Sequence, residues 1–330
     1  MRAYIIRRLG LILPTILLVT VIVFLTVRFV PGSLIDLMAS QMAGESAVSP
    51  EEIAEQIRHD LGLDQPVAKQ YLRWLGAWQQ DDGTFSGLLQ GNLGKSLWTQ
   101  RPILADILDK VPISLELGIM AIFTALLIAF PIGVYSAIRQ DTMGDYIGRS
   151  IAIFCMAVPG FWLATMIIVF PSVWWGWIPP VDYTPITKDF GENIKQFIIP
   201  SILMGMVMSG VTMRMTRTMM LEVLRQDYIR TAWSKGLRER VVVMRHALKN
   251  ALIPVVTIIG LQLPVLIGGT VIMEQIFNLP GMGRLMIDSL SRRDYSVISG
   301  INVMMASVIL VANLLTDLTY AWLDPRIRYR

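Results

Sequence analysis

The chain has 330 residues, of which 54% are hydrophobic and only 16% are charged, whereas a soluble domain carries about 25% charged residues. This composition excludes a disordered chain and disfavours a solvated globule. A single cysteine, Cys155, excludes an intrachain disulfide framework, and the two histidines, His59 and His246, are too few for a typical zinc or di-iron site. We therefore expect no metal and no cofactor. The net charge of +4 would suggest nucleic-acid binding, but its distribution along the chain indicates a lipid bilayer instead, and we expect no nucleic-acid partner.

Long apolar runs predict a polytopic membrane protein. A bilayer core about 30 Å thick requires about 20 apolar residues in a helix. Five runs reach that length, and a sixth does so only if its helix continues past Arg214. The runs cover residues 9–30, 115–138, 150–173, 198–213, 251–272 and 297–321. We expect an all-α protein with about six transmembrane helices.

The basic residues predict how these helices are oriented. If both termini are cytoplasmic, the inner segments 1–8, 139–149, 214–250 and 322–330 hold 17 Lys and Arg in 65 residues, against 11 in 132 for the outer segments. Cytoplasmic segments are enriched in Lys and Arg, so we place the N- and C-termini in the cytoplasm. The first run exceeds the core of a secretory signal, about 7–15 residues, and we interpret it as a retained helix.

The predicted spans divide the chain into three segments. Residues 1–30 form an N-terminal transmembrane helix, residues 31–114 an external loop, and residues 115–330 a core membrane domain with the inner loop 214–250. The external loop has helix signals of its own. Ser49, Pro50 and Glu52 match a capping box with proline at the first helical position. Two apolar stripes follow this capping box and predict a small external helical subdomain. The first stripe is Ile53, Ile57 and Leu61, and the second is Val67, Tyr71, Leu75 and Trp78.

The chain offers no convincing catalytic group. The segment 91–96 ends like a nucleotide-binding P-loop, but that pattern needs a glycine where Leu89 stands, and the topology places the segment outside the cell. Charges inside the spans are limited to Arg28, Glu116 and Asp317, each near a span end, where it can reach an interface or a partner. We therefore expect no enzyme, and any use of ATP requires a partner that binds it.

Neutral polar residues are the candidates for a translocation path. Gln262 and Asn313 lie deep in the fifth and sixth runs, where they line a path or form an interhelical hydrogen bond. Met208 belongs to a methionine-rich stretch that forms either an adaptable lining or simple core filling. Glu116, near the outer end of the second span, completes this set of four.

The inner loop 214–250 is the most informative segment. It holds 9 basic and 3 acidic residues and two helix-forming stretches, 219–233 and 238–251, which meet at Lys235, Gly236 and Leu237. Glycine is favoured where a helix ends and the chain turns. The pattern predicts a short helix held across the membrane face as a rigid lever; the alternative is a basic surface helix on anionic headgroups.

This loop closely resembles the inner loop of the dipeptide/oligopeptide/nickel branch of ABC-importer permeases. The similar segments of the loop are 220–224, Asp227-Tyr228-Ile229-Arg230-Thr231-Ala232, Lys235-Gly236-Leu237 and 245–254. Further family-like segments follow in order along the chain, at 28–32, 61–66, 159–162, 176–179, 280–283, 293–295 and 324–326. The long external loop is most similar to the first of the two permease subunits. The wider superfamily has glutamate where Arg230 stands, so a salt bridge from that position does not carry over.

The resemblance implies a type I importer half in a bacterial plasma membrane. Its partners would be a second homologous permease, two cytoplasmic ATPase subunits and an extracytoplasmic solute-binding protein. The coupling helix would seat in an ATPase groove. The residues expected at the ATPase are Asp227, Tyr228, Thr231, Ala232, Lys235, Gly236 and Leu237.

Other functions compete with the importer interpretation. A channel or secondary carrier also explains six spans with proline-broken helices, but it does not require the lever in loop 214–250. The resemblance implies short peptides first and another small solute second, such as glutathione, a nickel chelate or a sugar.

Overall fold

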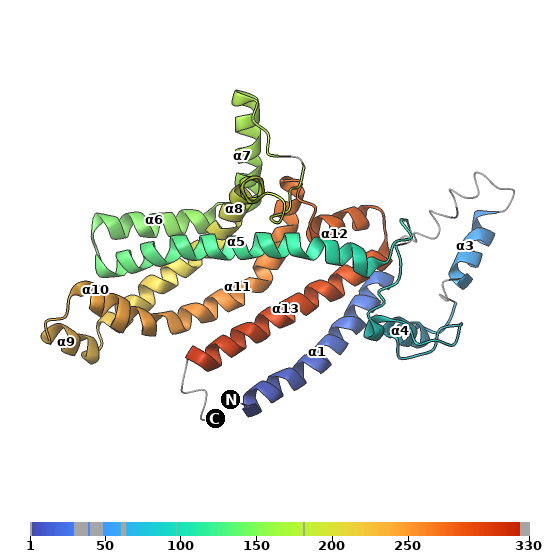
Figure 1. Ribbon diagram of the computed structural model, residues 1–330, viewed down its shortest axis with the longest axis horizontal. Helices are drawn as coiled ribbons and strands as arrows, with labels where there is room; N and C mark the ends of the chain where they lie inside the picture. Colours follow the sequence, from blue (N-terminus) through green and yellow to red (C-terminus); the bar gives the residue numbers. More distant parts are fainter. Residues whose placement is uncertain are drawn as a thin grey trace. The chain divides into compact units, whose positions relative to one another are not determined.

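The computed structural model describes residues 2–29, 39, 49–60, 64–96, 98–180 and 182–323. The family-like segments 28–32, 61–66 and 324–326 lie wholly or partly outside these residues, as do the side chains of Arg28, Ile57 and Leu61. The helices in chain order (Figure 1) are α1 (Arg2–Phe29), α3 (Pro50–Asp60), α4 (Val67–Leu75), η1 (Leu88–Gln90), α5 (Ile103–Ile138), α6 (Met143–Ala157), α7 (Gly160–Trp175), α8 (Phe190–Leu224), α9 (Asp227–Ser234), α10 (Glu239–Val241), η2 (Val242–Ala247), α11 (Leu248–Ile276), α12 (Met282–Ser291) and α13 (Tyr295–Leu323).

The all-α prediction is confirmed. Among the described residues the regular structure is helical, apart from one isolated bridge between Lys95 and Pro102. Four helices are long and apolar enough to cross a membrane: α5, α8, the continuous helix Glu239–Ile276, and α13 over Tyr295–Thr319. The pair α6 and α7 makes a fifth if it is one broken span, and the apolar part of α1, Gly10–Thr26, is shorter. This is roughly consistent with about six spans.

The third predicted span is not one straight helix. Helices α6 and α7 meet at a bend of 90°. Val158 has φ −84° and ψ 121°, and Pro159 is the N-cap of α7. Proline forces the preceding residue out of the helical region and removes a backbone donor, so the helix ends where Pro159 requires it. The apolar run 150–173 concealed this break because its hydropathy is continuous across the proline.

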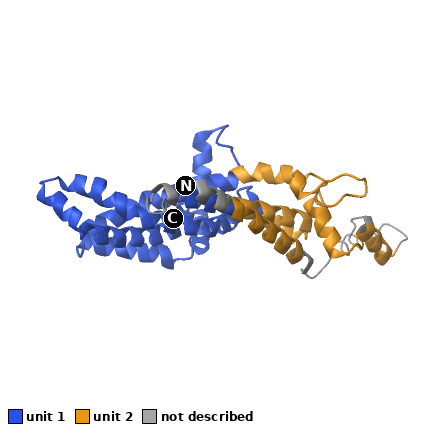
Figure 2. Cartoon of the chain, turned by 90° about the horizontal axis from the view of Figure 1, so that it is seen from below, with its two compact units in different colours: residues 1–5, 113–284, 309–330 blue, residues 6–112, 285–308 orange. Residues whose placement is uncertain are grey.

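The chain forms two compact units, coloured in Figure 2. Unit 1 holds residues 1–5, 113–284 and 309–330, and unit 2 holds residues 6–112 and 285–308. The units therefore cut across the three segments expected from the sequence. Those segments remain a prediction about membrane topology.

The core of unit 1 is built from α5, α7, α8 and α11. Leu117, Phe197 and Met208 are among its buried side chains. Helix α8 lies close to its neighbours because two of its residues lack a side chain. A Cβ on Gly205 would lie 2.7 Å from the carbonyl oxygen of Ala121, and one on Gly210 would lie 2.7 Å from that of Ala152. Small residues allow this approach in membrane helix pairs.

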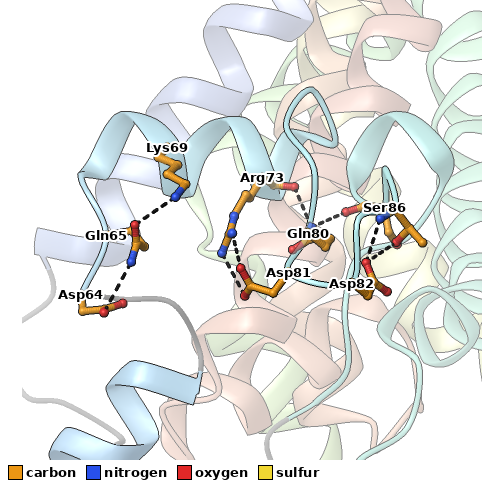
Figure 3. A network of polar contacts seen from close by, with 9 residues as sticks. Asp64, Gln65, Lys69, Arg73, Gln80, Asp81, Asp82 and Ser86 are labelled. Carbon is orange, nitrogen blue, oxygen red and sulfur yellow. Dashed lines mark hydrogen bonds and ion pairs between the residues drawn. The ribbon is translucent and has the colours of Figure 1, made fainter.

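Unit 2 contains α3 and α4, the helices of the loop that is predicted to be external. Ser49 caps α3 as expected, because the Glu52 amide donates to Ser49 Oγ at 3.3 Å, which is one of the two bonds of a capping box. Helix α4 ends at Leu75, before Trp78, because Gly76 adopts φ 85°. Figure 3 shows the polar contacts that fix the turn after α4. Arg73 pairs with Asp81, and Gln80 Nε2 donates to the carbonyl oxygens of Arg73 and Ser86 at 3.2 and 2.6 Å.

Candidate functional site

The inner loop folds as a helix, a turn and a second helix. Helix α8 ends at Leu224, and Gln226 is extended, with ψ 149°, before α9 begins. The sequence stretch 219–233 is therefore two helices rather than one. Asp227 occupies the first turn of α9, where a negative charge favours the helix N-terminus. The break lets α9 change direction relative to α8.

The glycine expected at the second turn has the conformation that the turn requires. Gly236 has φ 71°, and its amide donates to the carbonyl oxygen of Trp233 at 2.9 Å. A side chain there is disfavoured by the backbone alone, because a Cβ would meet open space. The chain then re-enters helix at Glu239 and passes through η2, a π-helical turn, into α11. Such turns occur frequently at functional sites.

Helix α9 has one buried and one exposed face. Ile229 and Ala232 are buried with Met220 of α8 and Val242 of η2. Ala232 thus packs against the rest of unit 1, whereas Leu237 is half-buried. The other residues expected at the ATPase are exposed: Asp227, Tyr228, Thr231, Lys235 and Gly236.

Two side-chain contacts join the loop to α11 and to the end of α5. Asn250 Nδ2 of α11 donates to Tyr228 Oη at 2.8 Å. The Arg139 guanidinium, at the end of α5, lies 3.4 Å from the Glu239 carboxylate. Figure 1 shows α9 and α10 at the same end of unit 1 as the turn between α5 and α6. Helix α9 and the turn after it are thus in contact with α5, α8 and α11.

The residues expected along a path differ in burial and contacts. Met208 is buried in the core of unit 1. Gln262 is half-buried, and its Nε2 donates to Thr212 Oγ1 of α8 at 3.4 Å, which is the interhelical bond considered from the sequence. Asn313 is exposed on α13. Glu116 is half-buried on α5. Gln262 thus contacts α8 one turn from Met208, and the path itself remains a prediction.

Glu116 belongs to a separate polar group. The side chain of Asn193, in the first turns of α8, lies near its carboxylate and donates from Nδ2 to the carbonyl oxygen of Thr184 at 3.1 Å. Tyr183 also lies close to it, in the segment between α7 and α8. Burial raises the pKa of the Tyr183 phenol, and the negative charge of Glu116 raises that pKa further. The phenol therefore stays protonated at neutral pH and is available as a hydrogen-bond donor.

Sequence reasoning missed two buried carboxylates. Asp145 of α6 is fully buried and accepts two hydrogen bonds from Arg217 of α8, both at 2.7 Å. Glu274 of α11 is fully buried and accepts from Ser114 Oγ of α5 at 2.6 Å. Asp145 lies in a loop segment of the predicted topology and Arg217 just beyond an apolar run, so nothing in the linear pattern pairs them. Opposite charges near the ends of two predicted spans are the sequence signal that could have suggested the Asp145–Arg217 pair.

The chain matches two family models along most of its length. Residues 129–329 match the binding-protein-dependent transport system inner membrane component, and residues 1–118 match the N-terminal region of the corresponding membrane component. The dipeptide transport system permease protein DppB of Escherichia coli K12 is 37% identical, with all of both chains covered. The di/tripeptide permease protein DppB of Pseudomonas aeruginosa UCBPP-PA14 is also 37% identical over all of both chains. The glutathione transport system permease protein GsiC of Pectobacterium atrosepticum is 36% identical, with 99% of each chain covered.

The fold is similar to a solved transporter structure. An inward-facing form of the MetNI methionine ABC transporter has a chain that matches with a TM-score of 0.54 and 16% identity, covering 66% of this chain and 96% of that one. At this identity the match concerns the fold alone. The resemblance noted in the sequence is confirmed: this multi-pass chain belongs to the family of binding-protein-dependent transport system inner membrane components, in the peptide branch of ABC-importer permeases.

Proposed function

We propose that the chain is the permease subunit of an ATP-driven importer and that it forms half of the translocation path for short peptides. Three full-length relatives carry names that refer to dipeptides, di- and tripeptides, or glutathione, which is itself a small peptide. The observation that carries the mechanism is α9, a short helix packed between α8 and η2 with one face left exposed.

The exposed face of α9 and the following turn bind a cytoplasmic ATPase subunit in this proposal. Tyr228, Thr231 and Lys235 supply an aromatic ring, a hydroxyl and a cation to that contact, and Gly236 makes room for a close approach. Ala232 acts from the opposite face, where its small side chain lets α9 pack against α8. Closure of two ATPases on ATP then moves α9 as a rigid body and carries α8 and α11 with it. ATP drives the change only by binding more tightly to the closed state.

The complete importer contains further subunits. A second homologous permease completes the path, two ATPases bind at the inner face, and an extracytoplasmic solute-binding protein delivers the peptide. The excess of Lys and Arg in the inner segments supports a plasma-membrane location with cytoplasmic termini. ATP is hydrolysed by the partner subunits, not by this chain. Gln262, Asn313 and Glu116 are the polar side chains available to the path from this half, and Met208 sets the packing of α8 behind it.

Purification of the complex tests the proposal. We expect the wild-type chain, extracted in mild detergent, to bring with it two ATPases and a second permease, with vanadate-sensitive ATPase activity. Gly236→Arg is expected to lose the ATPases while still inserting in the membrane, because it adds a bulky cation to the docking turn and strains φ. Gly176→Arg is the matched control. Gly176 also has positive φ, 64°, with open space around it, but it lies after α7.

Two outcomes would contradict the proposal. If Gly236→Arg and Gly176→Arg retain the ATPases equally, α9 and its turn are not the docking surface. If the chain purifies alone and moves peptide in liposomes without ATP, it is a channel or a secondary carrier. The substrate class is tested separately, by uptake of a labelled dipeptide in competition with glutathione. A sugar or a nickel chelate that competes where peptides do not would overturn the peptide assignment.

A further inference from the structure

A cavity of about 400 Å³ in unit 1 has walls of two chemical kinds. It lies between α5, α6 and α8. Arg149, Arg214 and Arg217 line it near the beginning of α6 and the end of α8, whereas Ile153, Met156 and Met213 line it farther along the helices. Along α6 the wall changes from Arg149 to Ile153 in one turn and to Met156 in the next. The cavity is therefore basic at one end and apolar at the other.

The three arginines at the basic end differ in how they are paired. Asp145 takes two donors of Arg217. Arg149 Nη2 lies 3.4 Å from Asp145 and 3.9 Å from Asp141, yet its Nε and Nη2 are buried and donate no hydrogen bond. The cavity is also lined by Ser136, whose buried Oγ has no partner. Asp145 and Asp141 thus already lie beside Arg149 and Arg217, and Arg149 also lies over the Tyr146 ring at 4.5 Å. Arg214, by contrast, is exposed at the cavity and can take an added anion.

We propose that this cavity binds an anionic phospholipid, with the headgroup phosphate at Arg149 and Arg214 and an acyl chain along Ile153 and Met156. The placement of this end of α6 and α8 at the inner leaflet rests on the membrane orientation proposed above. Basic pockets between transmembrane helices on the cytoplasmic side bind anionic headgroups. None of the residues that line this cavity is acidic.

The apolar wall distinguishes a lipid from other anions. Ile153 of this wall is 66% exposed. A free phosphate would leave that wall uncovered, whereas an acyl chain covers it. An acidic side chain of the second permease would reach the arginines without filling the apolar end. The combination of cation and apolar groove therefore favours an amphiphile.

Lipid binding to the purified full complex tests this proposal. Native mass spectrometry would follow the addition of phosphatidylglycerol, phosphatidylcholine or inorganic phosphate to the wild type and to Arg149→Gln/Arg214→Gln. Arg217 is left in place because it holds Asp145. Each arginine at an anionic lipid surface contributes roughly fivefold in affinity, so the double variant should bind phosphatidylglycerol about thirtyfold more weakly. Arg149→Lys/Arg214→Lys keeps the charges and should retain most of the affinity.

The control is Arg225→Gln/Arg240→Gln, which removes two exposed arginines outside the cavity and should bind phosphatidylglycerol like the wild type. Equal loss in both double variants would mean that overall charge, not the cavity, attracts the lipid. Equal binding of phosphatidylcholine, or displacement by inorganic phosphate, would overturn an anionic lipid as the occupant. Cross-linking of Ile153→Cys to the second permease, with no lipid bound, would identify that subunit instead. None of these measurements uses ATP or peptide, so they can fail while the importer proposal stands.

Discussion

Two buried carboxylates in unit 1 are held in opposite ways. Asp145, in the first turn of α6, is bound by the charged guanidinium of Arg217. Glu274, near the end of α11, is bound by neutral donors: Ser114 Oγ at 2.6 Å and the Arg284 amide at 3.0 Å. Ser114 Oγ in turn accepts from the Met282 amide at 2.8 Å. One carboxylate joins two helices by an ion pair, and the other joins a helix to a turn by a chain of hydrogen bonds.

We call these two sites the Asp145 junction and the Glu274 junction. Their different partners predict different effects of substitution. A buried ion pair depends on both charges, because removal of one leaves the other without compensation. A carboxylate held by neutral donors depends on the number and direction of its hydrogen bonds. The Asp145 pair fastens α6 to α8, the helix that leads into α9. The Glu274 network fastens α11 to the start of α12.

The largest effect is expected when the ion pair is broken from its cationic side. Arg217→Met leaves the fully buried Asp145 carboxylate with the Asp141 amide at 3.0 Å and Arg149 Nη2 at 3.4 Å, which does not donate a hydrogen bond to it, so we expect a loss of up to about 3–5 kcal/mol in unfolding free energy. Chemical unfolding in detergent measures it. Arg217→Met combined with Asp145→Leu should recover most of the loss, because two apolar side chains replace the pair.

A single variant as stable as the wild type would show that Asp145 is protonated or hydrated at no cost. The recovery in the double variant distinguishes an uncompensated charge from lost packing. If the double variant were as unstable as Arg217→Met, packing of the long arginine stem would be the dominant contribution.

Both junctions show where sequence reasoning stops. The apolar runs predicted the positions of the long helices, because hydropathy over about 20 residues is a local property. The pairing of residue 145 with residue 217 depends on which helices become neighbours, and that is set by packing, for example where Gly210 meets Ala152. The break at Pro159 was visible in the sequence, but its bend was not.

The candidate docking site could be predicted in part, because some of its structure depends on local sequence. The turn at Gly236 follows from a local signal, a glycine after a helix-forming stretch, whereas the break between Leu224 and Asp227 inside the predicted stretch 219–233 was not predicted. Which face of α9 is buried does not follow from so short a helix. Ala232 matches the family pattern as well as Thr231 does, and only the contact with Met220 and Val242 shows that it points inward.

A smaller effect is expected at the Glu274 junction. Glu274→Gln keeps the shape of the side chain but replaces one acceptor by a donor, which then faces either the Ser114 hydroxyl or the Arg284 amide. We expect a loss of about 1–3 kcal/mol, the cost of an unsatisfied buried group. Thermal unfolding in detergent measures the stability of Glu274→Gln and of Glu274→Gln/Ser114→Ala, which also removes the Ser114 hydroxyl. A large loss comparable with that of Arg217→Met would mean that the Glu274 charge itself, rather than its hydrogen bonds, holds the turn.

The smallest loss of unfolding free energy is expected at a third contact between helices, the bond from Gln262 to Thr212. The bond is long, 3.4 Å, and Gln262 Nε2 has a second acceptor, the carbonyl oxygen of Ile258, also at 3.4 Å. Interhelical hydrogen bonds in membrane proteins average about 0.6 kcal/mol, so Thr212→Val, which keeps the volume of the buried Thr212 side chain, should cost no more than that.

Because Thr212→Val frees Gln262 from α8, it distinguishes the two roles considered for Gln262. If Gln262 only fastens α11 to α8, Thr212→Val and Gln262→Leu should lower stability equally and leave the rate of peptide uptake per assembled complex unchanged. If Gln262 faces the peptide, Gln262→Leu alone should slow uptake, while Thr212→Val leaves the uptake rate intact.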